Sequence, residues 1–330
     1  MQTVFVIASN SFTGAHFVHH AIKNGYRVIG ISRSKENSSV MLPYRYRSTV
    51  ENFTFYQLDL NHDIEEIIRI ADNEKPTIIA NFAAQGEVRN SWKYPEQWYQ
   101  TNCMAVVRLT NELRKRDYIE KYVTSSTPEV YGSSEKNLIE NHNYFPSTPY
   151  AASKLAGDLH LITLFKRYQF PVVFTRSANV YGIHQQLYRI IPRTIIYLKL
   201  GKTIELHGSG KAVRSFVNIR DVADATLKVA ENGIAGETYH ISTQKEETSI
   251  KSLVELICSM MDCNFSDSVK LIDENYGQDA IYSLNSDKIR NQLGWKPKIS
   301  FEEGIQEMIK WIDANWDIIR NMQLKYVHKQ

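Results

Sequence analysis

Residues 4–14 read VFVIASNSFTG, a β-branched apolar run that leads into a turn of small residues. The run predicts a buried strand, and helical periodicity follows it over residues 14–23. A dinucleotide-binding fold normally has three glycines in such a turn, at the positions held here by Ala8, Ser11 and Gly14. Because alanine and serine are also small, a pyrophosphate can still approach the backbone N–H groups at the helix N-terminus. We therefore predict a cofactor-binding turn made of Ala8, Ser11, Phe12, Thr13 and Gly14.

The alternation of short strands and helices continues through the first half of the chain. Strands are predicted at 27–31, 53–57, 77–81, 121–125 and 171–175, and helices at 64–71, 96–116 and 149–167. The strands are too apolar to leave one face in water, so a parallel sheet with helices on both faces follows. Residues 1–176 are therefore predicted to form a Rossmann-like, doubly wound α/β domain that binds the dinucleotide.

Beyond residue 176 the rhythm is looser, because Pro192, Gly201, Gly208 and Gly210 separate shorter elements. Helices are predicted near 221–231, 250–261 and 302–315. We expect residues 177–330 to form a smaller, interleaved lobe that binds the substrate, with some segments returning to the first domain. Ligands of doubly wound sheets bind beyond the carboxyl ends of the strands, so cofactor and substrate would meet there.

The composition is that of an ordinary globular chain. The 330 residues include 39 basic and 36 acidic side chains, and the net charge of +3 argues against a nucleic-acid partner. No apolar run is long enough to span a membrane or to form the core of a signal peptide. The three cysteines show no CxxC spacing and fit reduced thiols. We therefore predict a cytoplasmic protein without a metal site or a membrane partner.

A tyrosine and a lysine four residues apart are predicted on one helix face, where residues 150–154 read YAASK. A free phenol, with a pKa of about 10, is too weakly ionised at neutral pH to act as a base. A neighbouring ammonium favours the ionised form, so Tyr150 with Lys154 could remove the hydroxyl proton of a sugar or steroid during hydride transfer to nicotinamide. The alternative is an ordinary half-buried pair on an amphipathic helix.

Residues 127–129, Thr-Pro-Glu, follow the predicted strand at 121–125 and so lie at the sheet edge where ligands bind. The Thr127 hydroxyl can hydrogen-bond a sugar C4 oxygen there. Glu129 can remove a carbon-bound proton that a neighbouring ketone has made acidic. The alternative for Glu129 is a loop carboxylate in solvent. The predicted catalytic set is Thr127, Glu129, Tyr150 and Lys154.

The end of the second strand bears on the choice of cofactor. A ribose 2′-hydroxyl usually meets an acidic side chain there, whereas this chain has Ser32, Arg33 and Ser34. Arg33 would suit a 2′-phosphate, which favours NADP over NAD, although a solvated loop cation is the alternative. Asp59 and Leu60 follow the third strand, where an acid can hydrogen-bond the adenine amine or cap a helix.

Further motifs occur in a fixed order along the chain. Residues 81–88 read NFAAQGEV, 125–132 SSTPEVYG, 176–182 RSANVYG, 190–192 IIP, 208–210 GSG and 293–297 LGWKP. Together with residues 150–154, this order resembles the extended short-chain dehydrogenase/reductase superfamily over nearly the whole chain. Within it, the chain resembles the nucleotide-sugar 4,6-dehydratases, such as the dTDP-glucose and GDP-mannose enzymes.

The resemblance implies an NAD(P) that stays tightly bound and is regenerated in each turnover. It also implies a homodimer formed through the helices at 96–116 and 149–167. Further cofactor contacts are implied for Phe82, Ala83, Ala84, Gln85, Asn102 and Ser125, beside Tyr150 and Lys154. Contacts to a nucleotide-diphosphate sugar are implied for Glu87, Thr127, Asn179, Arg189, Ile204, His207, Arg214 and Asp279. Of these, Asn179, Arg189 and Arg214 would bind the diphosphate.

Three features depart from the family pattern. The glycine turn is depleted, Pro128 stands where the dTDP-glucose enzymes have aspartate and the GDP-mannose enzymes serine, and Ala280-Ile281 replace an arginine of the dTDP-sugar relatives. A proline cannot donate a proton. Glu129 would then serve first as the base and then as the acid.

The expected activity is that of an NAD(P)-dependent NDP-hexose 4,6-dehydratase, a hydro-lyase. The C4 hydroxyl is oxidised, water is eliminated across C5 and C6, and hydride returns to C6 to give an NDP-4-keto-6-deoxyhexose. A 5,6-dehydratase acting on a hexose or hexosamine, a 4-epimerase and a uronate decarboxylase share the oxidation step and stay open as alternatives. A nucleotide-sensing scaffold is the alternative outside enzymes.

Overall fold

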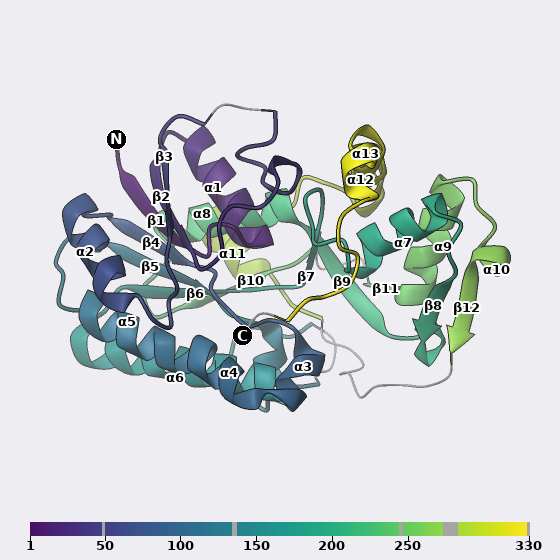
Figure 1. The fold of residues 1–330 in the computed structure, drawn as a ribbon. Helices are drawn as coiled ribbons and strands as arrows, with labels where there is room; N and C mark the ends of the chain where they lie inside the picture. Colours follow the sequence, from purple (N-terminus) through teal and green to yellow (C-terminus); the bar gives the residue numbers. More distant parts are fainter. Residues whose placement is uncertain (48–49, 134–136, 244–246, 273–282, 329–330) are drawn as a thin grey trace.

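The computed structural model describes residues 1–47, 50–133, 137–243, 247–272 and 283–328. Its main feature is a seven-stranded sheet in which every neighbouring pair is parallel (Figure 1). In order across the sheet the strands are β10 (Thr238–Ile241), β6 (Val172–Ser177), β5 (Lys121–Ser125), β4 (Ile78–Asn81), β1 (Thr3–Ile7), β2 (Arg27–Ser32) and β3 (Phe53–Gln57). The order reverses between β1 and β4, which confirms the predicted doubly wound α/β fold.

Alternate residues of a strand point to opposite faces of the sheet, and each face has its own core. Val4 and Val6 of β1 pack with side chains of α1 (Phe12–Lys23), α8 (Ile219–Asn232) and α11 (Asp287–Leu293). Phe5 and Ile7 pack on the other face with α2 (Ile64–Glu74), α5 (Ala105–Leu113) and α6 (Pro149–Tyr168). Both faces are therefore covered, as the apolar strands require.

The helix predicted over residues 96–116 is interrupted. It consists of α4 (Pro95–Tyr99), a π-helical turn (Gln100–Met104) and α5. Asn102 lies in the π-helical turn, where its side chain accepts from Gln85 N at 2.9 Å and donates to Ser153 Oγ at 2.9 Å. A Cβ on Gly157 of α6 would lie 2.4 Å from the Asn102 carbonyl oxygen, so the two helices touch backbone to backbone there. The π-helical turn therefore frees the buried Asn102 side-chain amide to link the loop after β4 to α6.

The second lobe contains two small sheets and the helices around them. One sheet joins β7 (Asn179–Tyr181), β9 (Val213–Asn218) and β11 (Glu247–Ser249), and the other joins β8 (Ile204–His207) and β12 (Val269–Ile272). The helices are α7 (Ile190–Lys199), α9 (Ile250–Met260), α10 (Phe265–Ser268), α12 (Phe301–Ala314) and α13 (Trp316–Ile319). Because β10 is a strand of the first sheet and α8 and α11 pack on that sheet, the chain passes between the lobes several times. The assignment of cofactor to one lobe and substrate to the other stays a prediction.

Two findings concern partners other than the ligands of the site. Within the described ranges, no helix has the length and apolar character needed to cross a membrane. In the same part of the chain, no group of three histidine, cysteine, aspartate or glutamate side chains is arranged to hold a metal ion.

Candidate active site

A cavity of about 1440 Å³ lies where the strands of the large sheet end and the second lobe begins. Its walls come from the turn after β1, the loops after β4 and β5, the start of α6, and elements of the second lobe. Of the predicted site residues, those lining it are Ser11, Phe12, Thr13, Phe82, Glu87, Ser125, Thr127, Glu129, Tyr150, Asn179, Arg189, His207 and Arg214. The cavity therefore lies at the switch in strand order, where doubly wound folds bind ligands.

Helix α6 presents Tyr150 to the cavity at its first turn. Thr148 caps the helix by accepting from Ala151 N at 3.1 Å, and Pro149 occupies the first helical position. One turn later, Lys154 is buried and its Nζ donates to the Ser125 carbonyl oxygen at 2.8 Å. Burial is the largest cause that lowers the pKa of Lys154, with Asp158 opposing and Arg176 adding to it. The lysine thus stands behind Tyr150, tied to the end of β5.

Thr127 and Glu129 belong to a short 3₁₀ turn, Pro128–Tyr131, at the end of β5. The buried Thr127 side chain caps this turn by accepting from Glu129 N at 3.3 Å. A hydroxyl that accepts one bond still has its own proton, which it can donate to a substrate oxygen. Pro128 starts the turn in place of a side chain that could donate a proton, and Glu129 lines the cavity directly after it.

A buried ion pair lies behind the catalytic helix. Arg176 Nη2 of β6 donates to Asp158 Oδ2 of α6 at 3.0 Å, and both side chains are almost completely buried. Asp158 also accepts from Ser126 Oγ, between Ser125 and Thr127. Burial alone would lower the pKa of Arg176, but the Asp158 carboxylate and two tyrosines outweigh it and the net shift is upward. The pair therefore fixes α6 against the strand end that carries Thr127.

Replacing Asp158 with asparagine is expected to reduce the free energy of unfolding by about 3–5 kcal/mol, because Arg176 would keep its charge without the carboxylate. Denaturant unfolding measures the loss. The matched control is Glu66→Gln, which breaks the exposed Arg69–Glu66 pair and should change stability much less. Equal losses for the two variants would contradict a stabilising role for the buried pair.

The turn after β1 compensates for its missing glycines. Ala8 takes the left-handed conformation that the first glycine would favour, with φ of 63°, and its carbonyl accepts from Ser11 N at 2.9 Å. Ser11 Oγ accepts from Gly14 N at 3.1 Å and so caps α1. A Cβ on Gly14 would lie 2.2 Å from the Ala8 oxygen, which explains why this glycine is kept. Ala8 and Gly14 shape the turn, and the three residues between Asn10 and Gly14 face the cavity.

Several predicted cofactor residues lie away from the cavity lining. Ser32 Oγ accepts from Asn10 N at 2.9 Å and thereby joins the end of β2 to the turn. Asp59 Oδ1 accepts from Asn61 N at 2.8 Å within the turn that precedes α2, whose N-cap residue is Asp63. Leu60 packs in the core of the α2 face, and Ala83 packs against that core.

Gln85 and Asn102 are buried and lie outside the cavity lining. The Asn102 side chain accepts from the Gln85 backbone N–H and donates to the Gln85 carbonyl oxygen. Arg33 and the exposed Ala84 are also outside the lining.

Ile204, a residue predicted to contact the substrate, does not line the cavity, whereas its neighbours in the same strand do. Ile204 is buried with Val254 and Cys258, whereas Leu206 and His207 of the same strand line the cavity. Adjacent residues of β8 alternate between buried and exposed, so strand register separates Ile204 from the exposed Glu205 and His207, both of which line the cavity. Leu206 shares the buried face with Ile204 and reaches the lining nearer the end of the strand. Asp279 and the Ala280-Ile281 departure lie outside the described residues.

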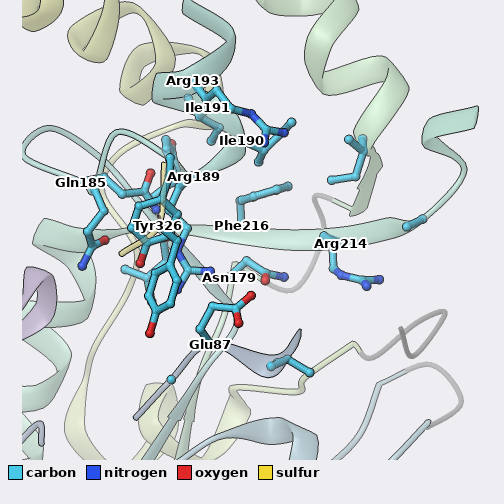
Figure 2. A pocket seen from close by; sticks show the side chains of 18 of the residues that line it. Glu87, Asn179, Gln185, Arg189, Ile190, Ile191, Arg193, Arg214, Phe216 and Tyr326 are labelled. Carbon is cyan, nitrogen blue, oxygen red and sulfur yellow. Dashed lines mark hydrogen bonds between the residues drawn. The ribbon is translucent and has the colours of Figure 1, made fainter. Parts of the chain in front are cut away.

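The cavity also has cationic lining residues that the sequence patterns did not indicate. Arg193 follows Arg189 by one turn of α7, and Lys211 lies between β8 and β9 (Figure 2). Figure 2 shows Arg189, Arg193 and Arg214 around the space opposite Glu87, and Lys211 also lines this cavity. These four cations, together with Arg89 and Lys325 of the same lining, favour a ligand with several negative charges, such as a diphosphate. The i, i+4 spacing of the two arginines is the signal that could have revealed Arg193.

The C-terminal segment adds lining residues too, namely Leu324, Lys325 and Tyr326. Because this segment is far in sequence from every motif quoted above, only its alternating pattern of side chains could have drawn attention to it.

Comparisons with known proteins agree with this geometry. Residues 9–308 match the family described as GDP-mannose 4,6 dehydratase. The human dTDP-D-glucose 4,6-dehydratase is 31% identical over 332 residues, which cover 98% of this chain and 93% of the human protein. The structure of dTDP-glucose 4,6-dehydratase from Streptomyces venezuelae, which has NAD bound, has a TM-score of 0.87 at 27% identity and covers 96% of this chain and 98% of that one.

A second fold relative has a different activity. The UDP-glucose 4-epimerase of Thermotoga maritima has a TM-score of 0.85 at 25% identity and covers 96% of this chain and all of that one, 100%. Because epimerases and dehydratases share the fold, the fold alone does not distinguish the two activities. The family match spans most of the chain, and this protein therefore belongs to the GDP-mannose 4,6-dehydratase family of extended short-chain dehydrogenases/reductases.

Proposed function

We propose that this protein is an NAD(P)-dependent NDP-hexose 4,6-dehydratase that forms an NDP-4-keto-6-deoxyhexose. The observation that carries the proposal is that Thr127, Glu129 and Tyr150 line the same cavity as the turn after β1 and the four cations of the second lobe. A cofactor, a sugar and a diphosphate can therefore occupy one continuous space.

The residues present fit a bound dinucleotide. Ser11, Phe12 and Thr13 line the cavity at the start of α1, where backbone N–H groups favour a pyrophosphate. Gly14 leaves room for the tight turn, since a Cβ would meet the Ala8 oxygen at 2.2 Å. When bound, NAD(P) accepts a hydride from the sugar and returns it, which no side chain of the site can do.

The side chains divide the proton transfers between them. Tyr150 takes the C4 hydroxyl proton, and Thr127 donates a hydrogen bond to the same oxygen. The resulting 4-ketone makes the C5–H acidic, and Glu129 removes that proton. Because Pro128 has none to give, the protonated Glu129 returns its proton to the departing C6 hydroxyl, which leaves as water. As C6 is then reduced, C5 takes up one proton from solvent and Tyr150 loses to solvent the proton that it took from the C4 hydroxyl, so the cycle balances.

The test is to incubate the protein with a panel of UDP-, GDP-, CDP- and dTDP-hexoses and to measure product masses and cofactor absorbance. A product lighter than the substrate by one water, without net NAD(P)H, is expected. If only NAD(P)H accumulates, the protein is a simple dehydrogenase and the proposal fails.

A 4-epimerase is the second candidate, favoured by Pro128 in place of a general acid and by the shared fold of a UDP-glucose 4-epimerase. An epimerase product has the same mass as its substrate, so the same experiment separates the two activities.

NADP is the proposed preferred cofactor, on the basis of Arg33 directly after β2 and the absence of an acidic residue at positions 32–34. Arg33→Ala is expected to weaken NADP+ binding roughly ten- to hundredfold, since a hydrogen bond to a charged group contributes about 1.5–3 kcal/mol. NAD+ binding should change little. Titration calorimetry measures both affinities, with the exposed Lys35→Ala as the matched control. Equal weakening of NAD+ and NADP+ would contradict the preference.

A homodimer through α4, α5 and α6 is also part of the proposal. These helices and the π-helical turn between α4 and α5 carry the exposed apolar side chains Tyr99, Met104 and Leu159, which a dimer interface would cover. Light scattering should give twice the mass of one chain, and a monomer at micromolar concentration would contradict it. A cytoplasmic location completes the proposal, supported by three cysteines without disulfides.

A further inference from the structure

The chain after α13 forms an extended segment, Met322–His328, that connects the two lobes. In Figure 1 it leaves α13 and runs toward α3 (Val88–Lys93) and α4 at the bottom of the first lobe. Half-buried residues alternate with exposed ones along it, as in a strand laid on a surface. The half-buried set is Met322, Leu324, Tyr326 and His328, and the exposed set is Gln323, Lys325 and Val327.

Both ends of the segment are anchored by side chains. Met322 and Leu324 pack against the core of the second lobe. At the far end, the His328 ring stacks on Tyr94, with centroids 5.1 Å apart, and on Trp98, with centroids 5.4 Å apart. His328 Nε2 also lies 2.6 Å from Gln97 Oε1. These three partners belong to the first lobe, so His328 joins the tail of the second lobe to the first.

Tyr326 lies between the two anchors and faces the cavity. Its ring meets Tyr188 edge-on at 5.4 Å, and its hydroxyl lies 3.3 Å from His328 Nδ1. Figure 2 shows it beside Arg189 and above Glu87. Burial and the nearby Tyr188 and Glu87 raise the pKa of the phenol, which therefore keeps its proton and can donate a hydrogen bond. It stands where the walls contributed by the two lobes meet.

The segment is held in a way that allows release. Within the described part of the chain, its last backbone hydrogen bond to the backbone is Met322 N to Ile319 O, at 3.0 Å. Beyond that point the described residues of the segment are held by side-chain contacts, so breaking the His328 contacts would free the segment without unfolding a sheet or helix.

We propose that Met322–His328 is a strap that closes the cavity over bound cofactor and nucleotide sugar, with His328 as the positioning residue that latches it and Tyr326 as a wall residue contacting the ligand. The inference rests on the proposed function for its purpose: a nucleotide sugar must enter and a product must leave, while the cofactor stays through two hydride transfers. A strap that opens for the sugar and closes over the cofactor meets both requirements.

The first experiment measures the release rate of NAD(P)H from the full-length protein by stopped-flow fluorescence. His328→Ala removes two aromatic contacts and should speed release roughly tenfold, whereas His328→Phe keeps the stacking and should restore most of the slow release. Val327→Ala, on the exposed side of the strap, is the matched control. An unchanged release rate in His328→Ala, or an equal change in Val327→Ala, would overturn the proposal.

The second experiment needs no substitution. Trypsin cleavage after the exposed Lys325, detected as loss of residues 326–330 by intact mass, should slow at least severalfold when NAD+ and a nucleoside diphosphate are added together. No protection by the ligands would contradict a closing strap. Both measurements depend on cofactor binding and not on product formation. The strap proposal can therefore be supported even if no lighter sugar product is found, and the proposed function is not contradicted if the strap proposal is.

Discussion

Replacing Tyr150 with phenylalanine is expected to lower kcat roughly 100- to 10,000-fold, the range that a positioned general acid or base contributes. The phenol is the group of α6 that faces the cavity, while Lys154 behind it is tied to the Ser125 carbonyl. Phenylalanine keeps the ring, the Thr148 cap and the helix, so only the proton acceptor is lost. Steady-state turnover of the NDP-hexose identified by the product assay measures the effect.

Tyr168→Phe is the matched control, because Tyr168 ends the same helix with its side chain 48% exposed. It should leave kcat within about twofold of the original protein. If Tyr150→Phe loses less than tenfold, Tyr150 is not the base. Unchanged cellular output of that variant would favour the nucleotide-sensing scaffold over an enzyme.

The parallel sheet could be predicted because strand and helix signals depend on neighbouring residues. β3 and β5 begin and end at the predicted residues, and α6 begins at Pro149 as expected. The π-helical turn could not be predicted, since its cause is tertiary: Asn102 bonds to Gln85 and Ser153, far from it in sequence. A single periodic run over 96–116 therefore looked like one helix.

Site residues that directly follow strands of the large sheet could be predicted from the sequence. Those that the second lobe contributes to the cavity were harder to predict. Thr127, Glu129 and Tyr150 follow from their place after β5 and at the start of α6. The register of β8 decided that Glu205 and His207 are exposed beside the cavity while Ile204 is buried, and a shift of one residue reverses every side chain of a strand. Tyr326 depends on a tail that crosses between lobes, which no local pattern specifies.

Replacing Glu129 with glutamine is expected to stop the reaction after the first oxidation. The amide cannot accept the C5 proton, so the 4-keto sugar stays bound and reduced cofactor accumulates to about one equivalent per site. The rate of product formation should fall roughly 100- to 10,000-fold, while the first oxidation, which depends on Tyr150, continues. A single-turnover experiment that follows absorbance of the reduced cofactor separates the two steps.

The effect is expected to be this large because neither neighbour of Glu129 in the turn can replace it. Its neighbour Pro128 starts the 3₁₀ turn and has no proton to exchange, and Thr127 is committed to capping that turn and to the C4 oxygen. Glu120→Gln, an exposed carboxylate just before β5, is the matched control and should turn over normally. Full activity of Glu129→Gln would mean that no C5 proton is removed, and with a product of unchanged mass it would identify a 4-epimerase. A stalled, reduced cofactor would instead assign the removal of the C5 proton to Glu129.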